Sequence, residues 1–343
     1  MRYAFWNNKG GTGKTSLAFQ AITEYAIKNP AKKILVLDLC PQANLSELFM
    51  GGLLGNGGAN LEVLYKQEPF SRSIGGYFQT RLSSPYKKPS IDVTEFIVTP
   101  YEYNANIPDN IELVAGDKAI ELQSNAISTL SINQIPGFDS YIQVINWLNN
   151  FVEEWLSLNP EGDVFIDTNP SFSMYTQIAL ATTERLIIPV MADDSSRRAL
   201  RNVFALVYGI DLDGNSATDY LPVFSTKITE AGMHLPQIHL ILKNRITQYM
   251  GPASAYSSVL RTIDNEITSI LSSNPTYFTF SDMKRGVVEI KDFQTAGVVA
   301  FAEATPFSRL KSGTHTIQGK DTQVNIDKKK ECEEAIERIV DNL

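Results

Sequence analysis

The feature that most constrains this chain is a glycine-rich loop at residues 9–15, set between a β-favouring segment and a helical segment. The loop reads Lys-Gly-Gly-Thr-Gly-Lys-Thr and matches the phosphate-loop pattern G-x-x-x-x-G-K-[ST], except that Asn8 replaces the first glycine. Residues 2–6 favour a strand, and residues 15–22 carry the apolar spacing of a helix. Strand, glycine loop and helix, in this order, are the context that the motif requires.

The polar groups of this loop suit the phosphates of a nucleotide. Its glycines allow successive backbone N–H groups to turn toward an anion, Lys14 can reach the β- and γ-phosphates, and the Thr15 hydroxyl can ligate Mg²⁺. The positive end of the following helix strengthens the same anion site. We therefore predict that ATP and Mg²⁺ bind here, through Gly10, Gly11, Thr12, Gly13, Lys14, Thr15 and Ser16.

The rest of the chain alternates strand-like and helix-like segments. Continuous apolar runs predict strands at 33–38, 110–116, 163–167, 185–190 and 239–244, and helical spacing predicts helices at 141–158 and 328–343. This alternation predicts an α/β fold, with a mainly parallel twisted sheet flanked by helices on both faces. We expect one P-loop domain spanning residues 1–343, elaborated at about 50–160 by loops and short helices.

Residues 9–16 resemble the deviant Walker A loop of the ParA and MinD family of ATPases, and the chain is most similar to the ParA-type partition ATPases. The extra lysine, Lys9, carries the resemblance. In that family this lysine reaches across a sandwich dimer to the phosphates bound by the partner. The resemblance therefore implies a homodimer in the ATP state, with Lys9 and Lys14 among the catalytic residues.

Three further segments are similar to the family's motifs. Residues 36–46 resemble D-x-D-P-Q-G-N, residues 167–171 resemble the Walker B and switch segment, and residues 240–244 resemble the strand whose closing Asn contacts adenine. The resemblance implies that Asp38 is catalytic and that Asn244 binds the nucleotide. It also implies a Mg²⁺ site formed by Thr15, Asp38 and Asp167.

Cys40 departs from the family pattern, because it replaces the second acid of the D-x-D motif, which positions the attacking water. A thiol with its ordinary pKa is a weak and mostly neutral acceptor at pH 7. We expect hydrolysis to be slow while binding persists, since losing such a group costs roughly 100- to 10,000-fold in rate. Two alternatives remain: another group such as Asp38 or a partner residue activates the water, or the ATP-bound dimer hardly turns over.

The composition is that of an ordinary globular protein, and it gives no sign of a transition-metal site. The 343 residues carry a net charge of −8, with 2 cysteines and 3 histidines that show no ligand spacing. No segment has the roughly 20 apolar residues that cross a bilayer, so we expect a cytoplasmic protein, associated with the nucleoid if it binds DNA. The 328–343 helix has an acidic polar face, which favours packing on its own domain over membrane binding.

We predict a ParA-type ATPase switch for partition or cargo positioning, which binds non-specific DNA as a dimer and responds to a partner protein of the ParB or adaptor type. A biosynthetic P-loop enzyme that forms an acyl-phosphate is the alternative, and an ATP-locked scaffold is another. Iron-sulfur reductases that share the loop need bridging cysteines, for which Cys40 and Cys332 are poorly placed. Basic clusters that could contact DNA phosphates are Arg197, Arg198 and Arg201; Lys284 and Arg285; Arg309 and Lys311; and Lys328 to Lys330.

Overall fold

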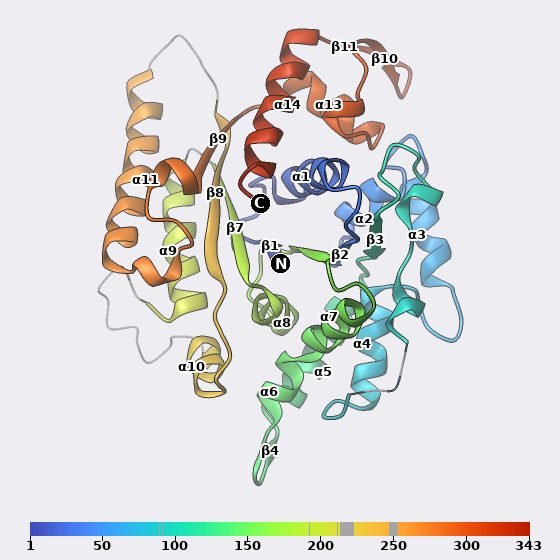
Figure 1. Cartoon of the computed structure of the whole chain (residues 1–343), viewed down its shortest axis with the longest axis vertical. Coiled ribbons are helices and arrows are strands. Elements are labelled where there is room, and N and C mark those ends of the chain that lie inside the picture. The colour runs from blue at the N-terminus through green and yellow to red at the C-terminus, as the bar shows by residue number, and fades with distance from the viewer. Residues whose placement is uncertain (89, 91, 192, 211, 213–222, 247–252) are drawn as a thin grey trace.

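The computed structural model describes residues 1–343 except 89, 91, 192, 211, 213–222 and 247–252 (Figure 1). At its centre lies a seven-stranded sheet in the order β3-β2-β6-β1-β7-β8-β9. The strands are β1 (Arg2–Phe5), β2 (Ile34–Leu39), β3 (Ile111–Val114), β6 (Asp163–Thr168), β7 (Arg185–Met191), β8 (Gln237–Ile246) and β9 (Val287–Lys291). Every neighbouring pair in this sheet runs parallel, so the predicted α/β fold is confirmed.

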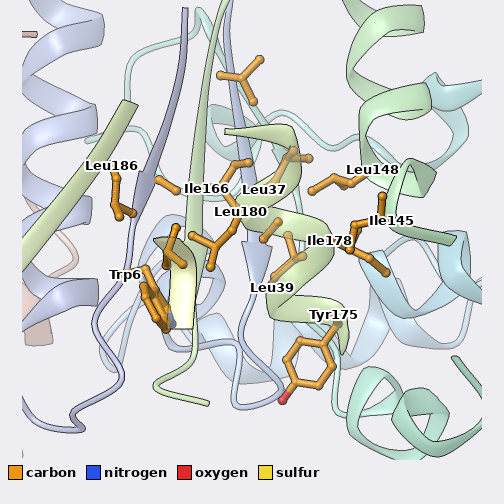
Figure 2. Packing of buried hydrophobic residues seen from close by; sticks show 14 of the residues in the cluster. Trp6, Leu37, Leu39, Ile145, Leu148, Ile166, Tyr175, Ile178, Leu180 and Leu186 are labelled. Carbon is orange, nitrogen blue, oxygen red and sulfur yellow. The ribbon is translucent and has the colours of Figure 1, made fainter. Parts of the chain in front are cut away.

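Alternate residues of each strand pack on opposite faces of the sheet, as the pleat requires. In β2, Leu35 and Leu37 belong to one buried cluster, whereas Ile34 and Val36 belong to the other. The first face is covered by α4 (Ile74–Ser83), α5 (Ala119–Ser131), α6 (Ser140–Ile145), α7 (Trp147–Leu158), α8 (Met174–Thr182), α9 (Asp194–Tyr208), α10 (Val223–Glu230) and α11 (Ala253–Ser273). Figure 2 shows part of this core, where Leu37, Leu39 and Ile166 of the sheet face Ile178 and Leu180 of α8.

The opposite face is covered by the helix that follows the glycine loop and by the C-terminal helix (Figure 1). Its helices are α1 (Lys14–Lys28), α2 (Asn44–Phe49), α3 (Gly57–Tyr65), α13 (Gln294–Ala302) and α14 (Ile326–Val340). The apolar stripe predicted for the last helix is buried, at Cys332, Ala335, Ile336, Ile339 and Val340. The prediction that this helix packs on its own domain is therefore confirmed.

The remaining elements are short. A hairpin of β4 (Gln134–Ile135) and β5 (Phe138–Asp139) projects from the α6 end of the molecule, and a hairpin of β10 (Gly313–Ile317) and β11 (Lys320–Val324) lies beside α13 (Figure 1). The helix α12 (Met283–Gly286) leads directly into β9.

Two expectations about the middle of the chain were wrong. The predicted single helix at 141–158 is two helices, because Asn146 turns its side-chain amide back to the Ile142 carbonyl at 2.8 Å and α7 starts anew at Trp147. The region at 50–160 holds longer helices than expected: α5 has 13 residues and packs against α4, α6 and α8. In α5, Ser, Asn and Gln residues lie between the apolar positions, which include the buried Ile120 and Ile127, so the helical spacing is hard to recognise in the sequence.

Candidate functional site

The predicted site residues meet at the carboxyl edge of the sheet. The glycine loop follows β1, Cys40 follows β2, and Asp167 ends β6, and these three strands are neighbours in the sheet. Ligand sites of open α/β sheets lie at this edge. A cleft of about 710 Å³ opens here, lined by Gly10, Gly11, Thr12, Gly13, Lys14, Thr15, Ser16, Cys40, Pro41, Gln42, Asn44, Glu121, Thr168, Asn169, Pro170 and Arg245.

The glycine loop adopts a conformation that needs glycine at two positions. Gly11 and Gly13 have φ angles of 73° and 83°, in the left-handed region that side chains disfavour. At Gly13 a Cβ atom would also come within 2.2 Å of Asn244 Nδ2, so a larger residue would collide with β8. Helix α1 then begins at Lys14, and its unpaired N–H groups and dipole face the cleft.

Two polar groups of the loop, the Lys14 ammonium and the Thr12 hydroxyl, have no anionic partner among the described residues. The Lys14 ammonium is buried and donates to the carbonyls of Asn7 and Lys9, at 3.3 and 3.2 Å. Burial lowers the pKa of Lys14, and the nearby Asp167 acts in the opposite direction. The Thr12 hydroxyl is buried with no hydrogen-bond partner among the described residues. A phosphate in the loop would pair with such groups, so the loop fits a nucleotide.

The predicted metal ligands lie together below this loop. Thr15 Oγ1 donates to Asp167 Oδ2 at 2.9 Å, and Asp38 lies opposite Asp167 in the β2–β6 register. Both carboxyl groups are fully buried, and burial raises the pKa of each; repulsion by Asp38 raises that of Asp167 further. Two buried carboxylates beside a hydroxyl are oxygen donors of the type that Mg²⁺ takes, so this set fits the ion.

Both carboxylate oxygens of Asp38 accept hydrogen bonds from the segment that follows β2. Its Oδ1 accepts from the Cys40 backbone N–H at 2.9 Å, and its Oδ2 accepts from the backbone N–H and hydroxyl of Ser46, at 3.0 and 2.7 Å. These bonds fix the turn that carries Cys40 into the cleft. Burial, with the charges of Asp38 and Asp167, raises the pKa of the Cys40 thiol to about 12. The thiol is therefore neutral at pH 7.

Lys9 is held within its own chain. Its ammonium pairs with Asp193 at 2.5 Å and contacts the Ser196 hydroxyl at 3.3 Å, both at the start of α9. Partial burial opposes the ionised form of Asp193, yet hydrogen bonds from Lys9, Ser195 and Ser196 hold its pKa at about 2. A lysine that reaches another subunit must first leave this pair.

Asn244 closes the other side of the loop. It is buried at the end of β8, and its Nδ2 donates to the Thr12 carbonyl at 3.0 Å while its Oδ1 accepts from the Arg245 backbone N–H at 2.9 Å. The structure thus places Asn244 against the phosphate loop. The adenine contact implied by the resemblance stays a prediction.

Two cleft residues escaped the sequence analysis. Arg245 follows Asn244 and has a φ angle of 55°, and Glu121 enters the cleft from the first turn of α5. Neither belongs to a motif, and Glu121 lies in the region expected to be loops. A helix predicted directly after the 110–116 strand would have placed Glu121 at the carboxyl edge of the sheet.

The predicted basic clusters differ in how free their charges are. Lys328, Lys329 and Lys330 lie near glutamates of the same helix, and Arg201 pairs with Glu266 at 2.7 Å. Lys284, Arg285, Arg309 and Lys311 are exposed, although Arg309 donates to the Asn106 carbonyl at 2.9 Å. In the described ranges, no helix is both long and apolar enough to span a bilayer.

Comparison with known proteins gives three kinds of match. A family model described as an AAA domain matches residues 2–218. The cell division protein PomZ of Myxococcus xanthus is 25% identical over 227 residues, which make up 64% of this chain and 55% of that protein. The match thus spans about half the length of this relative.

Two solved structures are similar over nearly the whole chain. McdA of Cyanothece in its ATP complex has a TM-score of 0.60 at 12% identity, covering 98% of this chain and 95% of that one. A plasmid partition protein of Borrelia burgdorferi has a TM-score of 0.52 at 15% identity, covering 100% of this chain and 99% of that one. At these identities the likeness concerns the fold.

Proposed function

Because the chain belongs to the ParA/MinD family of P-loop ATPases, whose AAA domain it matches over residues 2–218, we propose that it is an ATP-driven dimerising switch. Its task in this proposal is to partition DNA or position a cargo in the cell. Cell division and plasmid partition are the roles named for two of the proteins that it resembles, which favours this kind of task.

One observation carries the proposal: an anion cradle that holds the Lys14 ammonium lies beside a buried pair of acids. Lys14 supplies the positive charge inside the loop, and Thr15 and Asp167 supply oxygen donors 2.9 Å apart. Mg²⁺ held by Thr15 and Asp167, with Asp38 behind them, would neutralise the phosphates of ATP. Asn244 would then lie on the nucleotide side of the loop.

Dimerisation depends on Lys9 in this proposal. Its ammonium is engaged with Asp193 in the single chain, and ATP in a facing subunit offers it a stronger, more highly charged partner. Exchange of one partner for the other couples nucleotide binding to assembly. ADP lacks the γ-phosphate, so the ADP state should favour the monomer.

Turnover should be slow. A neutral thiol at Cys40 accepts hydrogen bonds weakly, so the water that attacks the γ-phosphate has a poorer guide than a carboxylate gives. A protein of the ParB or adaptor type would then accelerate release. A positioning switch needs nucleotide binding, nucleotide-dependent dimerisation and slow hydrolysis that limits the lifetime of the dimer.

DNA binding would come from exposed basic residues brought together in the dimer. Lys284 and Arg285 on α12, and Lys311 before β10, are exposed members of the predicted clusters, and none of these three forms an ion pair with another described residue. Contacts to phosphates alone carry no sequence preference and weaken steeply with salt. The proposed partner surface is therefore non-specific DNA.

Light scattering with ATP, with ADP and without nucleotide tests the switch. We expect a dimer with Mg-ATP alone, and retention of plasmid DNA by that dimer at low but not at high salt. Calorimetry should detect ATP binding that Lys14→Ala abolishes and that Lys66→Ala, an exposed lysine after α3, leaves intact.

Three results would contradict the proposal in different parts. Undiminished ATP binding by Lys14→Ala would remove the nucleotide site. A monomer in every nucleotide state would remove the dimer, and a dimer that ignores DNA at low salt would remove the DNA partner. ATP binding and dimerisation without measurable hydrolysis would make the protein an ATP-locked scaffold.

A further inference from the structure

The cleft has one acidic lining residue among those that the structure describes, and it is not a motif residue. Asp38 and Asp167 lie fully buried behind the loop, and the second acid of the D-x-D pattern is Cys40. Glu121, from the first turn of α5, is the carboxylate on the cleft surface. It is exposed, so its charge is available to a group inside the cleft.

The segment that leads to Glu121 packs directly on the turn that carries Cys40. Gly116 has no room for a side chain, because a Cβ atom would lie 2.8 Å from the Cys40 carbonyl and 2.9 Å from the Asp38 carboxylate. Its N–H donates to Ser46 Oγ at 2.8 Å. The segments that follow β2 and β3 are therefore in close contact, and α5 starts near the position where the family has its acid.

Glu121 is also tied to the segment that follows Asp167. Tyr175 donates its hydroxyl hydrogen to Glu121 Oε2 at 2.9 Å, and Asn169 Nδ2 donates to the same hydroxyl at 2.5 Å. Tyr175 is 1% exposed and belongs to the core shown in Figure 2, so its hydroxyl is held in a fixed position beside Glu121. Oε1 of Glu121 accepts no hydrogen bond from the described residues and stays open to a water molecule.

We propose that Glu121 is the water-positioning carboxylate of this chain, in place of the acid that Cys40 lacks; the inference rests on the proposed ATPase function. Its Oε1 accepts a hydrogen bond from the attacking water, while Tyr175 fixes the carboxylate. The water oxygen bonds to the γ-phosphorus, and the bond from phosphorus to the ADP oxygen breaks with its electron pair left on ADP. The proton released by the water passes to the inorganic phosphate.

Glu121→Gln tests the role with little disturbance of the fold, since an amide oxygen can still accept from Tyr175. We expect kcat to fall about 100-fold, the size of effect usual for such a group, with the Kd for ATP changed less than threefold. The ATP-bound dimer, followed by light scattering after dilution, should decay correspondingly more slowly. Glu62→Gln, at an exposed position of α3, is the matched control and should behave as wild type.

A second acid should rescue the loss. Cys40→Asp in the Glu121→Gln background is expected to recover at least tenfold in kcat, which a merely structural Glu121 would not allow. Tyr175→Phe, which removes the group that orients the carboxylate, should lower kcat and leave the Kd for ATP unchanged.

Several results would overturn the inference. An unchanged kcat in Glu121→Gln, or a parallel loss of kcat and ATP affinity, would do so while leaving the switch intact. Wild-type protein that dimerises with ATP yet shows no turnover would also remove it. Absence of ATP binding by the wild type would instead remove the proposed function itself.

Discussion

At the scale of single residues, buried charge sets the character of the cleft. Asp38 and Asp167 sit opposite one another without exposure, and burial raises the pKa of both because water no longer supports their charge. A divalent cation beside them removes that penalty. The same burial keeps the Cys40 thiol neutral, so the chain holds the groups that bind a nucleotide and lacks the usual group that activates water.

Cys40→Asp should raise kcat. The new carboxylate supplies a charged acceptor at the position where the family has one, and we expect an increase of at least about tenfold in steady-state phosphate release. Cys40→Ser is the control, because a neutral hydroxyl of similar size should change kcat little. Equal rates in wild type and Cys40→Asp would show that the replaced acid does not limit turnover.

Asp193→Ala should make the dimer form at lower ATP concentration. The change frees Lys9 from an ion pair that is worth at most about 1 kcal/mol at a half-exposed site, equivalent to a factor of about five. Light scattering over a range of ATP concentrations measures the midpoint. Glu62→Ala, at an exposed position of α3, gives a comparison with the same loss of charge. A midpoint that moves equally in both variants would assign the effect to net charge.

At the scale of elements, continuous apolar runs located the strands. Each of β1, β2, β6 and β7 contains an uninterrupted apolar run because parallel strands are buried on both faces, so their positions could be predicted to within about two residues. β9 has the burial pattern of an edge strand, with Glu289 and Lys291 exposed, and it carries no such run. The sequence did not predict helix α5, because polar residues lie between its apolar positions, and Glu121 was therefore missed as well.

The β10–β11 hairpin should loosen as pH rises. His315 of β10 pairs with Glu303 after α13 at 2.6 Å. Partial burial lowers the pKa of His315, but the hydrogen bonds to Glu303 and to the Lys311 carbonyl, with the charge of Glu303, together outweigh this and raise the pKa. A raised folded pKa means that the stabilisation is complete below about pH 6.5 and is lost as pH rises through the raised pKa.

A variant isolates that contribution. The Tm difference between wild type and Glu303→Gln should be a few degrees at most at pH 6 and should vanish by pH 9. Glu334→Gln, on the exposed face of α14, should show no such pH dependence. A difference that persists at pH 9 would mean that Glu303 acts without the histidine charge.

Ile339→Ala should destabilise the whole chain. The side chain is 0% exposed in the seam between α14 and α1, and removing it leaves a cavity that costs about 2–5 kcal/mol. Denaturant unfolding measures the loss. Glu337→Ala on the exposed face of the same helix should change the free energy of unfolding by less than about 0.5 kcal/mol. Equal stability of the two variants would mean that the helix is not packed on α1.

At the scale of the whole molecule, contacts between distant segments complete what the motifs begin. Tyr3 donates to the Leu343 carbonyl at 2.5 Å, and the amino-terminal ammonium pairs with Asp163 at 2.6 Å, so both ends of the chain are fixed to the sheet. The single domain expected at 1–343 stays a prediction. The Lys9–Asp193 pair spans 184 residues, and no local pattern in the sequence could predict it.

Mg-ATP should therefore stabilise the molecule as a whole, because the ligand joins segments from β1, β2 and β6 that separate on unfolding. At a free concentration of 100 times the Kd, linkage gives about 2.7 kcal/mol, a rise of a few degrees in Tm. EDTA should remove most of this rise, since ATP without the cation leaves its phosphates beside the buried carboxyl groups of Asp38 and Asp167 with no positive ion between them. Lys14→Ala should show no rise under either condition. A Tm that rises equally with ATP and with ATP plus EDTA would mean that the buried acids do not hold a metal ion.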